Sequence, residues 1–174
     1  MIIKKDNPKG IDFMIDRIQT KLGSMLSWND PYIYGRVYLN SKPDGNVVAE
    51  AYIGNDRYKD IFVDKSRSAV IGFVENGDVS FDETGKVQTM TVDIVCSVML
   101  NRIYDTVLRN DEEALQEVLK VVQKTAGWKI SKIRKGNVKN VFSFMDTKSI
   151  TFRDMQPYAN FAISCDVNYL NNIC

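Results

Sequence analysis

The chain has 174 residues, of which 44% are hydrophobic and 26% are charged, as in an ordinary globular protein of one domain. Its 23 basic residues balance 22 acidic ones, so the whole molecule has no electric field that would attract DNA, RNA or anionic lipid. The absence of histidine excludes catalytic triads that use imidazole as the base and zinc sites of the Cys/His kind.

Targeting signals are not expected. The opening residues, MIIKKDNPKG, lack the apolar run of a signal peptide, and no run of about 18 apolar residues predicts a membrane span. The 3 cysteines, Cys96, Cys165 and Cys174, lie far apart without CxxC spacing, which favours a reducing compartment over a disulfide framework. We therefore expect no metal site, no cofactor and no membrane partner.

Residues 7–26 predict an amphipathic helix. Asn7 is placed to cap it, and Pro8 suits the first helical position, where a missing N–H costs nothing. A single apolar stripe recurs at helical spacing and would pack on a sheet or, alternatively, on a neighbouring subunit: Ile11, Met14, Ile15, Ile18, Leu22 and Met25.

The next part of the chain, residues 32–81, predicts strands joined by turns. YIYGRVYLN at 32–40 alternates as a strand does, KPDGN at 42–46 has turn chemistry, and GNDR at 54–57 suits a hairpin. Asn76-Gly77 between two apolar runs predicts a further hairpin, because both residues tolerate positive φ. We expect the block at 42–86 to be a hairpin-rich insertion or projecting arm.

Residues 87–102 predict a strand of unusual length, whose alternation places Met90, Val92, Ile94, Cys96, Val98 and Leu100 on one face. A second amphipathic helix follows at 110–127, with Asn110 and Glu113 as a capping-box pair and Gly127 as its stop.

Residues 128–144 predict two short strands about Gly136-Asn137, and the segment from 152 leads to a last strand ending near Leu170. Together the pattern predicts one α+β domain over residues 1–174. Its mixed, mainly antiparallel sheet would carry two packed amphipathic helices and a β-hairpin extension.

Cys165 and Asp166 invite comparison with a catalytic pair, since a thiol and an acid stand side by side. On a strand, neighbouring side chains point to opposite faces, so Cys165 is expected in the core and Asp166 outside it. Cys96 occupies the matching apolar position in its own strand. We expect two buried thiols that act as small hydrophobes, and no catalytic residue.

One stretch is locally basic and carries the following cations: Lys129, Lys132, Arg134, Lys135 and Lys139. With the aromatic residues nearby it could bind nucleic acid through phosphates and stacked bases. The favoured interpretation is a solvated hairpin in a protein of balanced charge.

The order of these elements, together with the segment from Met155 to Tyr169, MQPYANFAISCDVNY, resembles the tail-terminator and tail-completion proteins at the neck of tailed bacteriophages. The resemblance is architectural over most of the chain and reaches single residues only in that segment, through PYANF and CDVNY. The block at 42–86 is longer than in compact members of that group.

The resemblance implies a structural virion protein, without enzyme activity or cofactor. It implies a homo-oligomeric ring of six-fold or twelve-fold symmetry between the head connector or neck proteins and the tail tube. DNA would only pass through the lumen. Two alternatives remain open: a module outside any virion that binds nucleic acid or another protein, with Lys132, Arg134 and Lys135 as the first contacts, and an enzyme that uses carboxylates or tyrosine.

Overall fold

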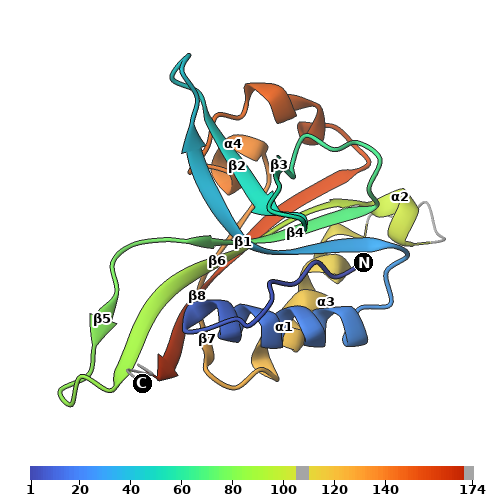
Figure 1. Ribbon diagram of the computed structural model, residues 1–174. Helices are drawn as coiled ribbons and strands as arrows, with labels where there is room; N and C mark the ends of the chain where they lie inside the picture. Colours follow the sequence, from blue (N-terminus) through green and yellow to red (C-terminus); the bar gives the residue numbers. More distant parts are fainter. Residues whose placement is uncertain (105–109, 171–174) are drawn as a thin grey trace.

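The computed structural model describes residues 1–104 and 110–170, which form one mixed sheet with helices on both faces (Figure 1). In chain order the elements are α1 (Ile11–Met25), β1 (Pro31–Ser41), β2 (Val47–Tyr52), β3 (Tyr58–Asp60), β4 (Ala69–Glu75), β5 (Ser80–Phe81), β6 (Val87–Met99), α2 (Leu100–Ile103), α3 (Asp111–Gln123), β7 (Trp128–Lys135), α4 (Val138–Val141), the 3-10 helix η1 (Lys148–Asp154) and β8 (Tyr158–Leu170).

The sheet is 8-stranded, with the order β3-β2-β1-β4-β6-β8-β7, and β5 pairs only with β6. Neighbouring strands are antiparallel except β1 and β4, which are parallel. The α+β class and the mainly antiparallel sheet are thereby confirmed. The two strands of 13 residues, β6 and β8, pair along their whole length and form the centre of the fold.

One face of the sheet, here called the helix face, is covered by α1 and α3 (Figure 1). The predicted alternation holds there: Ile94 and Cys96 of β6 and Ile163 and Cys165 of β8 lie in the same buried cluster as the stripes of both helices. Met25 departs from its stripe and is exposed, because it is the last residue of α1.

The opposite face, here called the far face, is covered by α4 and η1 and has a second buried cluster around Phe62, Phe142 and Ile150. The two strands predicted about Gly136-Asn137 are therefore wrong in their second half. The Asn137 side chain accepts a hydrogen bond from the Asn140 N–H at 2.9 Å and caps α4, whose buried residues have helical and not strand spacing.

The predicted cap of α1 is wrong, and the predicted cap of α3 is right in its position but not in its side-chain hydrogen bond. Helix α1 begins at Ile11 after Gly10 (φ 57), with no side-chain cap. The segment before it pairs with β1 through an Ile3 N–H to Ile33 carbonyl bond of 2.9 Å, so the chain must turn back before the helix can start. Asn110 precedes α3 as predicted, but its side chain makes no capping hydrogen bond to the helix.

The Asn76-Gly77 turn does not join a hairpin, which corrects the sequence expectation. Both β4 and β5 pair with β6, one beyond the other, and the Asn76 N–H donates to the Thr91 carbonyl at 2.9 Å. The hairpin turn lies at 82–86 instead. There the Asp82 carboxylate accepts hydrogen bonds from the Lys86 and Val87 amides, and this fixes the reversal between β5 and β6.

The block at 42–86 is consequently not one insertion. It contains β4, an interior strand between β1 and β6. Two separate parts of this region project from the body in Figure 1: the β1–β2 hairpin and the hairpin formed by β5 and the start of β6. We call the second projection, residues 76–90, the arm.

Candidate assembly surfaces

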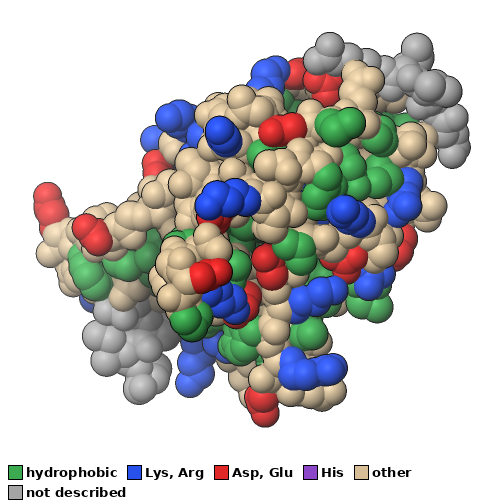
Figure 2. Space-filling view, turned by 90° about the horizontal axis from the view of Figure 1, so that it is seen from above, with side chains coloured by type: hydrophobic (Ala, Val, Ile, Leu, Met, Phe, Trp, Pro, Cys, Tyr) green, Lys and Arg blue, Asp and Glu red, His purple; other side chains and the backbone are tan. Residues whose placement is uncertain are grey.

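The arm carries two exposed apolar side chains. Phe81 is 57% exposed and Val79 is 37% exposed. The arm continues past α1 and α3, so the described helices do not cover it (Figure 1). Figure 2 shows acidic side chains at its tip with hydrophobic side chains directly behind them. This combination is typical of a surface that another chain covers.

The arm carries three exposed acidic side chains, Asp78, Asp82 and Glu83. Hydrogen bonds from the Val87 amide and the Thr84 hydroxyl lower the pKa of Asp82. Asp78 and Glu83 are exposed beside it and have no ion-pair partner in the described part of the chain. The arm therefore presents an acidic tip next to an apolar patch.

The second open surface is β7, at the opposite end of the sheet order from β3. Its inner side pairs with β8, and no strand of the described residues pairs with its outer side. Ile133 is 41% exposed on this strand. A bulge between Ile130 and Lys132 and three lysines interrupt the strand, as is common where a protein must prevent indiscriminate edge pairing.

The basic stretch of the sequence is largely this β7 edge, and the structure separates its cations. Arg134 makes a 2.7 Å ion pair with buried Asp93, and Lys135 makes one of 2.7 Å with Glu112 of α3. Lys139 lies on α4. Only Lys129 and Lys132 remain on the edge without an acidic partner among residues 1–104 and 110–170. Two isolated lysines can neutralise few phosphates and therefore provide little affinity for nucleic acid.

A hollow of about 310 Å³ lies between the N-terminal segment, α1 and the β2–β3 hairpin. Its main cation, Arg36, is already held by Asp12 at 3.1 Å and Glu75 at 2.9 Å, and it donates to the Tyr38 hydroxyl at 2.8 Å. Tyr58 stands edge-on to Tyr38, with ring centroids 5.5 Å apart. The guanidinium of Arg36 is therefore already occupied by groups of its own subunit.

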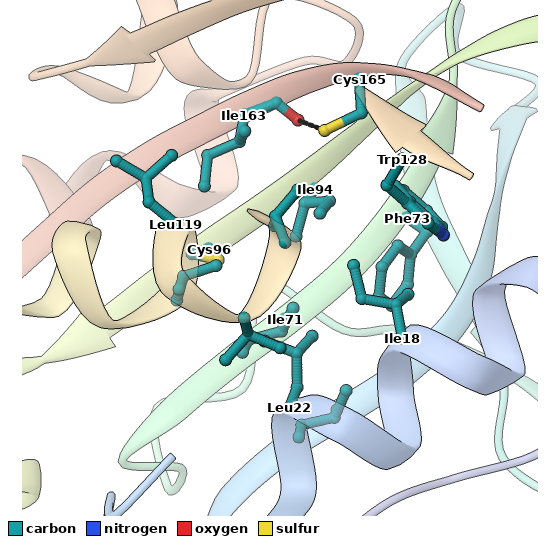
Figure 3. Close-up of a cluster of buried hydrophobic side chains, with 14 of the residues drawn as sticks. Ile18, Leu22, Ile71, Phe73, Ile94, Cys96, Leu119, Trp128, Ile163 and Cys165 are labelled. Carbon is teal, nitrogen blue, oxygen red and sulfur yellow. Dashed lines mark hydrogen bonds between the residues drawn. The ribbon is translucent and has the colours of Figure 1, made fainter. Parts of the chain in front are cut away.

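The two thiols lie where the sequence predicted. Cys96 and Cys165 are buried among aliphatic and aromatic side chains on the helix face (Figure 3). Burial raises the pKa of both, that of Cys165 to about 12. The Cys165 thiol reaches only the Ile163 carbonyl, at 3.9 Å, and Asp166 points to the other face. Neither thiol has a base beside it. Cys174 lies outside the described residues.

Arg153 is a buried charge that no sequence pattern predicted. It belongs to η1 and is 1% exposed, and its guanidinium donates to the Phe62 and Asp64 carbonyls at 2.7 Å each and to Ser97 Oγ at 2.9 Å. Burial lowers its pKa. All its bonds go to neutral groups of the protein, so it joins the far-face layer to the sheet and does not present a charge to a ligand.

Among residues 1–104 and 110–170, no group of three acidic or cysteine side chains is placed to hold a metal ion. Within the same ranges, no helix is long and apolar enough to cross a membrane. No protein-family model matches the chain, and no curated protein matches it either.

Proposed function

We propose that this protein is a structural virion protein that forms a ring at the head–tail neck or tail terminus of a tailed bacteriophage. In the ring, copies of the chain contact one another in six-fold or twelve-fold symmetry, with the connector or neck proteins on one side and the tail tube on the other. The protein is assembled in the bacterial host and resides in the virion. DNA passes through the lumen.

The arm is the observation that supports this proposal most. It places Phe81 and Val79 on a ribbon that projects from the body, while the sheet leaves β7 open on another side of the same subunit. Two different surfaces that both need covering favour head-to-tail contacts, which close into a ring when the rotation permits. The balanced charge favours the same arrangement, because side-by-side copies do not repel strongly.

The proposal assigns no catalytic role and no cofactor. The two thiols of the described residues, Cys96 and Cys165, are buried with raised pKa values, which favours a structural role for both. The alternative of a nucleic-acid-binding module receives less support, because Arg134 and Lys135 are occupied by Asp93 and Glu112.

A reconstruction of assembled tailed particles tests the proposal. We expect density for this chain as a closed ring on the tail axis, and deletion of the gene should leave heads and tails unjoined or tails of irregular ending. Finding the chain only as a soluble monomer that shifts DNA in a salt-dependent way would replace the proposal with the nucleic-acid alternative.

A further inference from the structure

We infer that the subunits of the ring are joined by a strand-to-strand contact in which the open edge of β5 in the arm of one copy pairs with the open edge of β7 in the next. The inference rests on the proposed function for its symmetry. It adds the contact itself, its register and the residues that meet there.

The directions of the strands permit this pairing. Residues 88 and 89 of β6 pair with β5 on one side and with β8 on the other, so β5 and β7 face opposite ways from the centre of the sheet. Each step from β5 through β6 and β8 to β7 is antiparallel, which makes β5 and β7 antiparallel to each other. If a rotation relates one subunit to the next and preserves the strand directions, β5 of one copy lies antiparallel to β7 of the other. The antiparallel sheet then continues across the contact.

The backbone groups select the register. The Asp82 N–H donates to the Val87 carbonyl at 3.0 Å, so Asp82 faces β6 and the N–H and carbonyl of Phe81 face outward. On β7, the Gly136 N–H donates to the Asn160 carbonyl at 3.2 Å. Alternation along the ladder then turns the N–H and carbonyl of Ile133 outward as well. Phe81 opposite Ile133 gives two inter-subunit hydrogen bonds.

The side chains agree with that register on both faces. Phe81 lies opposite Gln88, which shares the helix face with Met90, and Ile133 lies opposite Ile163 on the same face. The two exposed apolar side chains therefore meet. On the far face the same register places Asp82 of one copy opposite Lys132 of the next. Lys132 has no acidic partner among the described residues of its own subunit.

The pairing is short, and the structure shows where it ends. The Lys135 carbonyl already accepts a hydrogen bond from Asn140 Nδ2 at 2.9 Å, so the ladder cannot extend fully beyond Ile133 in that direction. The bulge after Ile130 limits it in the other. A contact with so few bonds is weak for one pair of subunits and gains strength when a ring closes, since each subunit is then held at both edges.

Site-directed disulfides test the contact in the full-length chain, with Cys174→Ser as background. Phe81→Cys and Ile133→Cys are combined in one chain, which is concentrated, oxidised and separated on a non-reducing gel. The matched control combines Ser80→Cys with Ile133→Cys, because Ser80 is adjacent to Phe81 but on the far face. We expect a ladder of covalent oligomers that ends at the ring number, with on the order of tenfold more product than in the control.

Mixing the two single variants separates the possible contacts. Phe81→Cys with Ile133→Cys should give mixed dimers and nothing larger, and neither variant should form dimers alone. Dimers of Phe81→Cys alone would indicate an arm-to-arm contact and overturn the inference, as would a yield no higher than that of the control.

The outcome is independent of the proposed function. If the particle carries a ring of this chain but the subunits do not cross-link, the proposed function is supported and the β5–β7 contact is excluded. A closed covalent ladder from a chain that is absent from the particle keeps the contact and removes the phage assignment.

Discussion

Arg153 and Phe62 are joined by a 2.7 Å hydrogen bond from the Arg153 Nε to the Phe62 carbonyl, although 91 positions separate them in the chain. The bond ties η1 to the loop that follows β3. Ser97, in the middle of β6, is held by the same guanidinium and also donates to Asn160 Oδ1 at 2.8 Å. Arg153 thus links the far-face layer to the sheet through hydrogen bonds, and we call it a structural pin.

Replacing Arg153 by Met should destabilise the fold strongly, by about 3 to 5 kcal/mol, because buried carbonyl and hydroxyl groups lose their donor. The free energy of unfolding from urea titration measures this. Arg57→Met is the matched control: Arg57 is exposed, and its loss should change stability by no more than about 0.5 kcal/mol. Equal effects of the two substitutions would show that Arg153 is not a structural pin.

Asp93→Asn should cost about 3 kcal/mol, because Asp93 is 2% exposed and the substitution leaves Arg134 without its anion. A double-mutant cycle with Arg134→Met isolates the ion pair. The exposed pair of Glu112 and Lys135 has the same 2.7 Å separation and is the control, and Glu112→Gln should have no measurable effect. If Asp93→Asn lowered the free energy of unfolding no more than Glu112→Gln does, burial would not be what makes the Asp93–Arg134 ion pair important.

Gly127→Ala should destabilise by about 3 kcal/mol. Gly127 has φ +87, and a Cβ there would lie 2.5 Å from Met14 Cε and 3.1 Å from the Asn168 carbonyl oxygen. Gly45→Ala separates the two causes, because Gly45 has φ +82 but no atom within 4 Å of an added Cβ, so only the backbone cost of about 1 kcal/mol remains. Thermal unfolding of both variants measures the difference, and equal losses would rule out the close approach as a cause.

The buried thiols should make the fold less stable in alkali. The pKa of Cys165 is raised from 9.0 to about 12, so its protonated form is favoured in the folded state. The stabilisation is complete below pH 9 and is lost as pH rises from 9 towards 12, at up to about 1.4 kcal/mol per pH unit. Denaturant titrations across this range should show a shallower fall for Cys165→Ala.

A thiol reagent at neutral pH gives an independent check of burial. Cys96 and Cys165 should react slowly in the native protein, and Cys174 is predicted from the sequence to react quickly. Equal native rates at all three positions would contradict burial of the first two.

Lys132→Glu should weaken assembly while leaving the single subunit as stable as before. In the inferred contact it would face Asp82 of the neighbour, and two like charges opposite each other are unfavourable. The concentration of half-assembly should rise roughly fivefold, less at high salt. Lys120→Glu, a change at another exposed lysine, on α3, is the control for net charge. Light scattering measures both, and equal shifts would exclude a specific partner for Lys132.

The sequence predicted correctly those helices and strands whose own hydrophobic pattern shows which face is buried. The alternation in β6 and β8 and the stripes of α1 and α3 identify buried faces without knowledge of the neighbours, and so Cys96 and Cys165 were placed correctly. The Gly136-Asn137 dipeptide misled because its turn chemistry serves equally to start α4. The cap predictions were inaccurate for a similar reason. A residue such as Asn7 or Asn110 is able to cap a helix, but tertiary contacts decide whether its side chain makes the capping hydrogen bond.

The arrangement of strands was beyond the reach of local patterns. The parallel pairing of β1 with β4 and the extension of β5 along β6 depend on contacts between distant residues. Phe81 shows the limit clearly. It is an apolar residue of a strand, yet β5 lies where no described helix covers the sheet, so its side chain is 57% exposed.

The full-length pairing of β6 with β8 also has a consequence for how the chain is made. Residues 1–86 contain two strands, β4 and β5, that pair with β6, and β6 in turn pairs along its whole length with β8, which is translated some 70 positions later. Until β8 emerges from the ribosome, the aliphatic rows of β4 and β6 have no closed interior. Sheets that close through pairing between distant residues fold slowly and expose apolar surface to aggregation until they close. A stop codon before residue 158 should therefore yield an aggregating fragment and not a smaller working domain.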